Sequence, residues 1–346
     1  MKAATVLHGD IEVRDIPAPP DLGPGQIRVR IEACGICGSD LSLRKDVDQF
    51  VRVSRLGRHA SSDFDADDYV VPGHEFAGVV DAVAPDVTSF SEGDRVTGLG
   101  IVTDQVTGER SIIGYSNSYP GGFGELVVIN AESARMIPDG MSFDTASLAE
   151  PLHVGETHVQ RSGFGTDDRG LVIGAGTIGL GVVIALRERG CDDITVVEPS
   201  PRRRQIATAL GAHRVVEPPT DGGPVAALDP GSTARVVVYE CSGRQGVIEE
   251  LTRTLPQGSY IQVVASPFTE ETFVPVIAQW RQLIINFGGG PVEDSYGITL
   301  RRLAEGRIDP DLFITAHVDL HGVAQAFEDL RDPERHVKIV VHPGRT

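Results

Sequence analysis

Cysteine is scarce in this chain of 346 residues, which contains only Cys34, Cys37, Cys191 and Cys241. Four such scattered cysteines do not make a disulfide framework in a chain of this size, so we expect reduced thiols that are available to a metal. Long apolar runs are also missing: no stretch approaches the length of a membrane span, and the opening MKAATVLHGDIEV lacks the apolar core of a signal peptide. These absences predict a cytoplasmic protein without a membrane partner.

Basic residues are outnumbered, with 31 Lys and Arg against 49 Asp and Glu and a formal net charge of -18. This excess opposes binding to nucleic acid phosphates or anionic lipid and favours a solvated, repulsive surface. Apolar residues make up 40% of the chain, an ordinary proportion for a globular protein. A chain of this length is expected to form two domains.

Two kinds of sequence pattern divide the chain. From residue 1 to about 150, short strands such as QIRVRIEACG, EFAGVVDAVA and GELVVI are separated by Gly, Pro and Asp, which predicts a β-rich domain. From residue 171 to about 287, apolar strands alternate with helical periods, which predicts a doubly wound parallel sheet. The tail ends in a strand, VKIVVHP, that we expect to rejoin the first domain. We therefore assign residues 1–152 and 288–346 to one domain and 153–287 to a dinucleotide-binding domain.

The least patterned stretch extends from Leu43 to Asp68 and is rich in charge. Loops of this length without secondary structure are uncommon in compact domains and are usually functional or disordered. We expect a long loop here, which either lies on the substrate side of the protein or is a surface excursion without a role in binding.

A glycine-rich segment, LVIGAGTIG, follows a predicted strand and precedes a predicted helix. It places Gly174, Gly176 and Gly179 at G-x-G-x-x-G spacing, where the glycines permit a tight turn, the approach of a pyrophosphate and close packing of helix on strand. Backbone N–H groups at the start of the helix, at Thr177 and Ile178, are then available to the cofactor phosphates.

Glu198 ends the next predicted strand, ITVVE. A carboxylate at this position accepts hydrogen bonds from the adenosine ribose hydroxyls and repels a 2′-phosphate, so NAD is favoured over NADP. Arg202, Arg203 and Arg204 follow at once, and guanidinium groups suit either a phosphate or the polar face of a helix. NADP therefore stays open as an alternative.

Cys34 and Cys37 stand at C-x-x-C spacing in EACGICGSD, a spacing shared by redox pairs, structural zinc sites and pairs of buried thiols. A structural zinc site needs a second pair of soft ligands nearby, and no cysteine follows until Cys191. A redox pair opens the helix of a βαβ unit, whereas this pair follows a strand in a β-rich context. Cys37 is thus either a metal ligand or a thiol of the core.

His74 and Glu75 are adjacent in a glycine-flanked turn, VVPGHEFAGVV, before an apolar strand. Thiolate, imidazole and carboxylate are ligands that zinc accepts in open catalytic sites, so Cys37, His74 and Glu75 form a candidate trio. Taken singly, each residue has a simpler interpretation as a core or surface side chain. Their combination favours a metal.

Glu150, in SLAEPLHVGET, is a candidate fourth ligand. A carboxylate in apolar surroundings is costly unless it is paired, and a metal or its bound water is a suitable partner. His153 and His158 lie nearby in the sequence and are weaker candidates for contact with metal or substrate.

In this order the motifs resemble those of the zinc-containing medium-chain dehydrogenases/reductases of the alcohol dehydrogenase superfamily, within it the sorbitol and threonine dehydrogenase branch. The resemblance covers essentially the whole chain, through CGICGSD, GHEFAGVV, GDRV, PGGFGELV, AEPLHVG, GAGTIGL, VVEPSPRRR, ECSG and HVKIVVHP. It implies a GroES-like catalytic domain, built from both ends of the chain, around a central Rossmann domain. It also implies a homodimer or homotetramer that transfers a hydride between an alcohol, polyol or sugar hydroxyl and NAD(P).

The resemblance further implies roles for the residues of the metal motifs. Cys37 and His74 resemble catalytic zinc ligands, and Glu75 resembles the adjacent acidic ligand. Glu150 resembles a fourth ligand that binds directly or through water. Asp40 resembles the carboxylate that orients the ligand histidine.

Three further residues take their roles from the same resemblance. Ser39 resembles the hydroxyl that accepts the substrate proton. Glu198 resembles the residue that binds the adenosine ribose, and Arg203 resembles a residue at the adenine end of the cofactor.

Three features depart from the family pattern. Most zinc-containing members hold a structural zinc on four cysteines after the GDRV segment, whereas residues 95–122 contain none, so we expect one zinc per chain. The interval between Cys37 and His74 is longer than usual, which puts assignment of the substrate by analogy in doubt. The histidine often found after VG is replaced by Thr157 or displaced to His158.

Two other functions fit part of the pattern. A zinc-free, NADPH-dependent enone or quinone reductase would keep both domains without the metal. A non-catalytic dinucleotide-binding redox sensor would need the glycine-rich motif alone. The set of Cys37, His74, Glu75 and Glu150 disfavours both, so we expect a zinc-dependent dehydrogenase in which Ser39 passes the substrate proton toward solvent.

Overall fold

The computed structural model describes residues 1–57, 64–289, 292 and 294–344. The chain divides into two compact units, Met1–Glu150 together with Leu300–Thr346, and Pro151–Thr299. The sequence pattern predicts boundaries after residues 152 and 287, close to the first of these divisions and twelve residues before the second.

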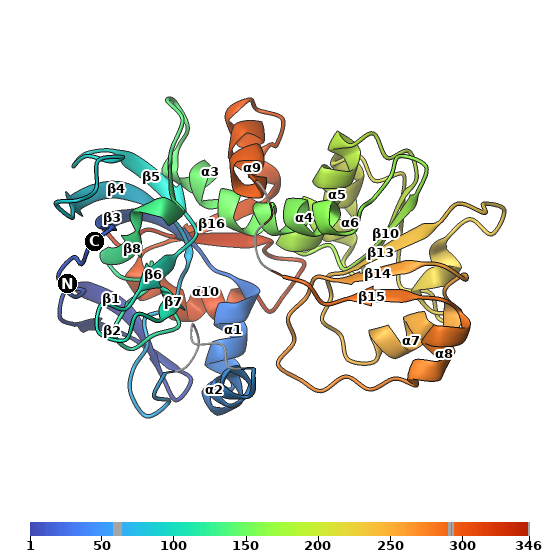
Figure 1. Ribbon diagram of the computed structural model, residues 1–346, viewed down its shortest axis with the longest axis horizontal. Coiled ribbons are helices and arrows are strands. Elements are labelled where there is room, and N and C mark those ends of the chain that lie inside the picture. The colour runs from blue at the N-terminus through green and yellow to red at the C-terminus, as the bar shows by residue number, and fades with distance from the viewer. Residues whose placement is uncertain (58–63, 290–291, 293, 345–346) are drawn as a thin grey trace. The chain divides into compact units, whose positions relative to one another are not determined.

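The first unit is rich in β-structure and takes its elements from both ends of the chain (Figure 1). Its strands are β1 (Lys2–Leu7), β2 (Asp10–Asp15), β3 (Gln26–Gly35), β4 (Glu75–Val83), β5 (Arg95–Gly98), β6 (Ile101–Thr103), β7 (Arg110–Ile112), β8 (Leu126–Asn130), β9 (Ala134–Met136), β16 (Ile314–Val318) and β17 (Lys338–Val341). Its helices are α1 (Gly38–Lys45), α2 (Val47–Leu56), α3 (Phe143–Ser147) and α10 (Val323–Asp329). The main sheet has the order β16-β17-β3-β4-β5-β9, with β8 also paired to β3.

The pairing of β3 with β4 brings the two halves of the metal motif together. The strands are antiparallel, and Gly35 at the end of β3 faces Glu75 at the start of β4. A Cβ atom on residue 35 would lie 2.1 Å from Oε2 of Glu75, so glycine leaves the space that this carboxylate fills. Cys37 follows β3 and His74 precedes β4, and the register therefore places both near the same end of the sheet.

The carboxyl-terminal strand completes this region. β17 pairs antiparallel with β3, with Val340 opposite Gly35 and Val341 opposite Cys34. The last strand thus joins the sheet of the first unit and lies directly beside the metal motif. Its interior-facing side chains, Ile339 and Val341, are almost completely buried in the same apolar core as β3.

The expectation of a long loop over residues 43–68 is wrong for half of that stretch, which is helical. Residues up to Lys45 continue α1, and Val47–Leu56 form α2, whereas residues 58–63 lie outside the described part of the chain. Asp46 caps α2 by accepting a hydrogen bond from the N–H of Gln49 at 2.9 Å. Charged residues on the outer side of α2 obscure the helical period of Phe50 and Val51, which are buried.

β6 and β7 form a hairpin in the region after GDRV, where most zinc-containing family members are expected to carry four cysteines and this chain has none. Oδ1 of Asp104 accepts hydrogen bonds from the N–H groups of Val106 at 2.9 Å and Thr107 at 2.7 Å. These bonds, that of Thr107 first, lower the pKa of the Asp104 carboxyl. The Asp104 carboxylate therefore organises this turn through backbone hydrogen bonds.

The second unit is a doubly wound sheet, as the sequence predicts. Its elements are β10 (Arg169–Ile173), α5 (Thr177–Glu188), β11 (Ile194–Val197), α6 (Pro201–Ala209), β12 (Arg214–Val216), β13 (Val236–Glu240), α7 (Val247–Thr254), β14 (Tyr260–Val263), α8 (Pro275–Trp280) and β15 (Ile284–Asn286). The six strands are parallel in the order β12-β11-β10-β13-β14-β15, and α5 and α6 cover one face while α7 and α8 cover the other (Figure 1). The order reverses between β10 and β13, where such sheets bind nucleotides at the carboxyl ends of the strands. Two further helices, α4 (Ala149–Arg161) and α9 (Ser295–Ala304), cross the division between the units.

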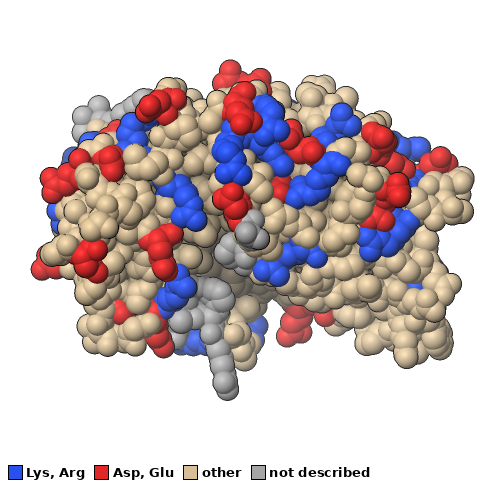
Figure 2. Space-filling view, turned by 45° about the horizontal axis from the view of Figure 1, so that its top comes forward, with Lys and Arg blue, Asp and Glu red and all other residues tan. Residues whose placement is uncertain are grey.

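One face of the molecule carries charges of both signs (Figure 2). On the face shown in Figure 2, Lys and Arg side chains are interspersed with Asp and Glu. Within the described part of the chain, no helix combines the length and apolar character needed to cross a bilayer.

The second unit contains a buried histidine whose protonation opposes folding. His158 on α4 is 6% exposed, and its Nδ1 lies 2.9 Å from Nε2 of Gln262 on β14. Burial, together with the nearby charges of Arg161 and His153, lowers the pKa of His158 to about 4. An unfolded histidine has a pKa of about 6.5 and so binds more protons between these values, which means that stability falls as the pH falls through this window.

We predict that lowering the pH from 7 to 4.5 reduces the free energy of unfolding of the wild type by about 2–3 kcal/mol more than that of a His158→Gln variant. Urea unfolding at a series of pH values measures the difference. His321→Gln, at an exposed position, serves as the control and should follow the wild type. Parallel curves for wild type and His158→Gln would show that His158 is not protonated on unfolding.

Candidate metal centre and cofactor site

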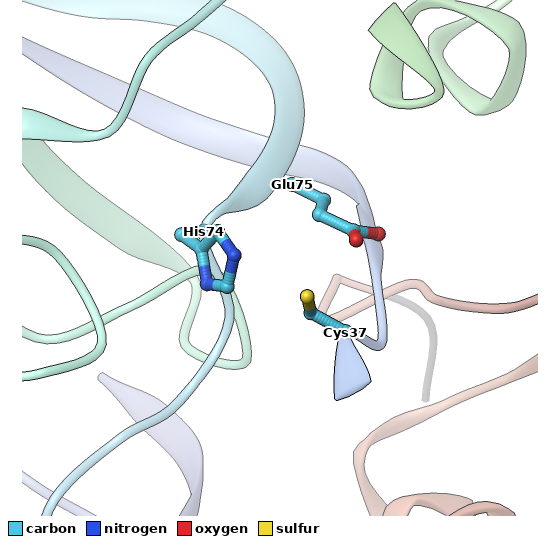
Figure 3. A group of neighbouring side chains, drawn as sticks. All are labelled: Cys37, His74 and Glu75. Carbon is cyan, nitrogen blue, oxygen red and sulfur yellow. The ribbon is translucent and has the colours of Figure 1, made fainter. Parts of the chain in front are cut away.

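Cys37, His74 and Glu75 converge in the first unit. One potential ligand atom from each lies within 4.8 Å of the others. Cys37 is the N-cap of α1, His74 is in the turn before β4, and Glu75 begins that strand. Figure 3 shows the sulfur, the imidazole ring and the carboxylate around a common space.

The chemistry of these side chains fits a zinc ion. His74 and Glu75 are 8% and 1% exposed, and Nδ1 of His74 is buried without a hydrogen bond. A buried nitrogen without a partner is costly, and coordination of the ring is one way to stabilise it. Sulfur, nitrogen and oxygen together form a donor set typical of zinc.

Asp40 connects the two turns that carry these side chains. It is completely buried, and Oδ2 accepts a hydrogen bond from the N–H of Cys37 at 2.9 Å while Oδ1 accepts one from Gly73 at 3.3 Å. Oδ1 is 3.9 Å from Nδ1 of His74, which is longer than a hydrogen bond. Asp40 therefore holds the backbone on both sides of the cluster, and its carboxylate lies beside the ring of His74 without bonding to it.

Negative charge accumulates around the imidazole. Burial alone lowers the pKa of His74, but the side chain of Cys37 and the charges of Glu150 and Asp40 outweigh burial and raise this pKa well above its ordinary value. For the carboxyl of Asp40, burial acts in the other direction and raises its pKa. Glu150, at the start of α4, thus acts on the site through its charge but is not among the three residues grouped within 4.8 Å.

Lys338 is a component of the site that the sequence analysis missed. Its Nζ lies 2.7 Å and 2.6 Å from the two carboxylate oxygens of Glu75, and it also donates to the carbonyl of Ile36 at 2.8 Å. Lys338 and Glu75 are 3% and 1% exposed. Burial lowers the pKa of Lys338, but Glu75 and Cys37 raise it more strongly, so the net change is upward. The only sequence signal for it is a lysine at the start of the otherwise apolar strand KIVV, which does not indicate its partner.

Ser39 has a partner that was also missed. The hydroxyl of Tyr115 donates to Oγ of Ser39 at 2.6 Å. The Tyr115 ring lies 5.3 Å from that of His74 and 5.3 Å from that of Phe50 on α2. Burial, reinforced by the charge of Asp40, raises the pKa of Tyr115 well above its ordinary value, so its phenol stays protonated and remains a donor.

The glycine-rich turn of the second unit has the geometry that its sequence predicts. Gly174 has φ +89°, and a Cβ on Gly179 would lie 2.0 Å from the carbonyl oxygen of Gly174. Gly176 caps α5, and a Cβ there would meet nothing within 4 Å. Thr177 and Ile178 form the first turn of α5, where backbone N–H groups lack helical partners.

Glu198 follows β11 and is bonded to the same turn. Oε2 accepts a hydrogen bond from the N–H of Ala175 at 2.6 Å, and Oε1 accepts one from Ser200 at 2.9 Å. Arg204 donates to the carbonyl of Glu198 at 2.9 Å and to Glu217 at 2.8 Å. Arg203 lies in the first turn of α6, where its N–H donates to Oγ of Ser200 at 3.1 Å.

The other candidates on α4 belong to the second unit. His158 is bonded to Gln262, and the hydroxyl of Thr157 donates to Ser295 at 2.9 Å. His153 lies 5.3 Å from the ring of Tyr296. Among the described residues, neither histidine is part of a metal-ligand group.

We predict that Lys338→Met lowers the unfolding free energy of the metal-free protein by about 3–5 kcal/mol, because it leaves the Glu75 carboxylate buried without a cation. A Glu75→Gln/Lys338→Met double variant should recover most of this loss, since neither charge remains. Urea unfolding of both variants measures the loss and the recovery of unfolding free energy. Lys338→Arg is the control, because it keeps the positive charge. Equal stability of the single and double variants would mean that the pair does not govern folding.

Two family profiles match the chain. The profile for an alcohol dehydrogenase GroES-like domain covers residues 23–139, and that for a zinc-binding dehydrogenase covers residues 177–296. The first match lies within the β-rich unit, and the second begins at α5 and lies within the unit that holds the parallel sheet.

Known proteins resemble the chain over nearly its whole length. (R,R)-butanediol dehydrogenase of Neisseria gonorrhoeae is 30% identical and is aligned over 99% of this chain and 100% of its own. Sorbitol dehydrogenase of Gallus gallus is 30% identical and is aligned over 98% of this chain and 95% of its own. The crystal structure of 2R,3R-butanediol dehydrogenase from Bacillus subtilis matches with a TM-score of 0.81 at 28% identity, covering 99% of both chains. The predicted resemblance is confirmed: the chain belongs to the zinc-containing medium-chain dehydrogenase/reductase family of alcohol and polyol oxidoreductases.

Proposed function

We propose that this oxidoreductase transfers a hydride between a hydroxyl of a small alcohol or polyol and NAD, at a single catalytic zinc held by Cys37, His74 and the carboxylates of Glu75 and Glu150. The convergence of a thiol, an imidazole and a carboxylate within 4.8 Å carries this proposal. Relatives named butanediol and sorbitol dehydrogenases support a small polyhydric alcohol as the substrate class. A sugar is included in the proposed substrate class, because its hydroxyl would undergo the same hydride transfer.

The four ligands have different roles in this proposal. Both carboxylate oxygens of Glu75 are bonded to Lys338, which already compensates the charge of Glu75 and leaves this carboxylate less available to a metal than Cys37 and His74. We assign Cys37 and His74 as the permanent ligands. Glu150, directly or through water, and Glu75 complete the coordination.

When bound, zinc supplies Lewis acidity toward the oxygen of the substrate hydroxyl, which favours loss of its proton. Ser39 is the proposed acceptor of that proton. Tyr115 occupies one lone pair of Ser39 Oγ with its own hydrogen bond, so the second lone pair is available to the substrate while the serine hydrogen moves on. Serine has no suitable pKa to keep a proton, so the proton continues toward the cofactor ribose and solvent. Asp40 positions the two ligand-bearing turns.

The contacts of Glu198 support NAD over NADP. Each of its oxygens accepts one backbone hydrogen bond and retains a lone pair, so the carboxylate is held beside the glycine-rich turn while it can still accept from ribose hydroxyls. Arg204 is engaged by backbone carbonyls and Glu217, which leaves it less available to a 2′-phosphate. We place the phosphates at the N–H groups of Gly176, Thr177 and Ile178, and Arg203 at the adenine end.

An exposed apolar edge of the second unit supports a homodimer. β15 is the last strand of its sheet. Ile284 within this strand and Phe287 directly after it are 55% and 62% exposed. Trp280, at the end of α8, is 74% exposed. An uncovered apolar edge strand is a template for pairing with another chain, and a second copy is the partner we propose. We also propose a cytoplasmic location, where the four free thiols stay reduced.

We predict that Phe287→Glu shifts the full chain from a dimer, or a larger even assembly, toward the monomer, because it places a charge in the apolar edge. Sedimentation velocity measures the mass. Leu56→Glu changes an exposed leucine of the first unit and should leave the assembly intact. A wild type that sediments as a monomer would contradict this edge as an interface.

The catalytic proposal is tested with zinc analysis and an alcohol panel, using NAD and NADP in parallel. We predict that Cys37→Ala loses one zinc equivalent per chain and lowers kcat/KM for the best alcohol at least about 100-fold, beyond the usual effect of changing an outer-shell residue. Cys34→Ala, which removes the other thiol of the motif, should keep this zinc. NAD should give the higher kcat/KM.

Three outcomes would contradict the proposal in different ways. Full activity of zinc-free protein would reject the metal mechanism. Reduction of enones with NADPH, without alcohol oxidation, would indicate the zinc-free reductase. Tight NAD binding without turnover of any substrate would indicate a redox sensor.

A further inference from the structure

A second group of potential metal ligands lies in the first unit and takes no part in the proposed catalytic site. Asp144, His317 and His342 each place one ligand atom within 4.8 Å of the other two. Asp144 is in the first turn of α3, His317 is in β16, and His342 directly follows β17. β16 and β17 are parallel neighbours, and the N–H of His342 donates to the carbonyl of Val318 at 2.9 Å, so the two histidines are held side by side.

The hydrogen bonds of His342 determine which ring nitrogen faces Asp144 as an acceptor. Nδ1 lies 2.7 Å from the backbone carbonyl of Glu32, which can only accept, so Nδ1 carries a hydrogen. The neutral ring therefore presents a lone pair at Nε2. That nitrogen is 3.3 Å from Oδ1 of Asp144, a carboxylate oxygen that also only accepts.

Two acceptors that face each other at this distance repel unless positive charge lies between them. Nε2 of His342 is buried without a hydrogen bond, in a residue that is only 5% exposed. Either a metal cation or an added proton on Nε2 removes the conflict. A histidine that donates its other N–H to a backbone carbonyl is the usual arrangement for a metal ligand.

His317 makes the cation the better solution. Its Nε2 is 3.2 Å from the other oxygen of Asp144, Oδ2, and the two imidazole rings lie 5.4 Å apart with an interplanar angle of 29°. Metal–ligand bonds of about 2.0–2.2 Å in a tetrahedral zinc site place ligand atoms about 3.3–3.6 Å apart. The two nitrogen–oxygen distances, 3.2 Å and 3.3 Å to the two oxygens of the same carboxylate, are close to this spacing. The side chain of His317 is 46% exposed, so solvent can supply a remaining ligand.

The negative surroundings favour a cation, and the ligand types favour a transition metal. Asp144 and His342 line a surface cavity together with Glu32, Asp81 and Glu125. Arg30 also lines it, but the carboxylates outnumber this guanidinium. Two imidazoles and one carboxylate suit Zn²⁺ or Co²⁺ better than Mg²⁺ or Ca²⁺, which prefer oxygen alone.

We propose that Asp144, His317 and His342 bind a divalent transition-metal cation, zinc or a close analogue, at a site separate from the catalytic centre. The ion would join α3, from the amino-terminal part of the unit, to β16 and β17 from its carboxyl-terminal part. Because it binds only the folded arrangement, it stabilises the unit in proportion to the logarithm of free metal concentration. The chain would then hold two metal ions instead of the one expected from its missing cysteines.

Metal titration of the chelator-treated full chain tests this site. We expect the wild type to bind two equivalents of Zn²⁺. His317→Gln should weaken the affinity of one of them at least about 10-fold, so that only one equivalent binds tightly. Asp144→Asn is a second variant of nearly unchanged shape, and His321→Gln, at another exposed histidine, is the control that should retain both ions. His317 is half exposed, so its replacement is not expected to disturb folding.

Cobalt distinguishes the two sites by their ligands. Co²⁺ at a site containing Cys37 gives a sulfur-to-metal charge-transfer band, whereas a site of two imidazoles and a carboxylate gives ligand-field bands alone. In a Cys37→Ala background, where the charge-transfer band is lost, we expect one equivalent of Co²⁺ to remain, and His317→Gln to remove it. Zn²⁺ should also raise the Tm of Cys37→Ala but not of Cys37→Ala/His317→Gln.

The outcomes separate this site from the catalytic one. If Cys37→Ala binds no metal, or if His317→Gln keeps two equivalents, Asp144 is paired with a protonated histidine instead and the proposed site is wrong. Failure of the catalytic assignment would show differently, as an absent charge-transfer band in the wild type, and would leave the His317-dependent equivalent unaffected.

Discussion

Buried negative charge is the constraint on which the first unit depends. Asp40 and Glu75 are 0% and 1% exposed, and the charges of Cys37 and Glu150 act on the same imidazole of His74. Such groups are costly inside a protein unless cations and hydrogen bonds compensate them. Lys338 compensates Glu75, and backbone N–H groups compensate Asp40. A metal ion at Cys37 and His74 would satisfy the remainder, so the same requirement links folding of this unit to its chemistry.

Three strands bring this arrangement together. β3 leads to Cys37, β4 begins at Glu75, and β17 carries Lys338, so one run of neighbouring strands assembles residues that are up to about 300 positions apart. β17 then ends beside His342, where a second cluster has formed. The sheet of the first unit therefore positions two potential cation sites from one set of backbone pairings.

Much of the fold was predictable because its signals are local or ordered along the chain. The glycine spacing around Gly174, the alternation of strands with helices and the sequence of motifs all led to the confirmed family and fold. The convergence of Cys37 with His74 followed from the same motifs. By contrast, Lys338 and Tyr115 depend on strand register and side-chain packing between distant segments, which no spacing reveals. The helix over Val47–Leu56 was missed because its charged outer side obscured the period of its buried residues.

The central claim is that one sulfur, that of Cys37, shares a zinc ion with the imidazole of His74. X-ray absorption at the zinc edge tests it most directly, on full chain carrying Asp144→Asn and His317→Gln and loaded with one zinc. The account predicts one sulfur neighbour at about 2.3 Å, with nitrogen and oxygen neighbours at about 2.0–2.2 Å. A shell of nitrogen and oxygen alone, or one with two or more sulfur atoms, would contradict it.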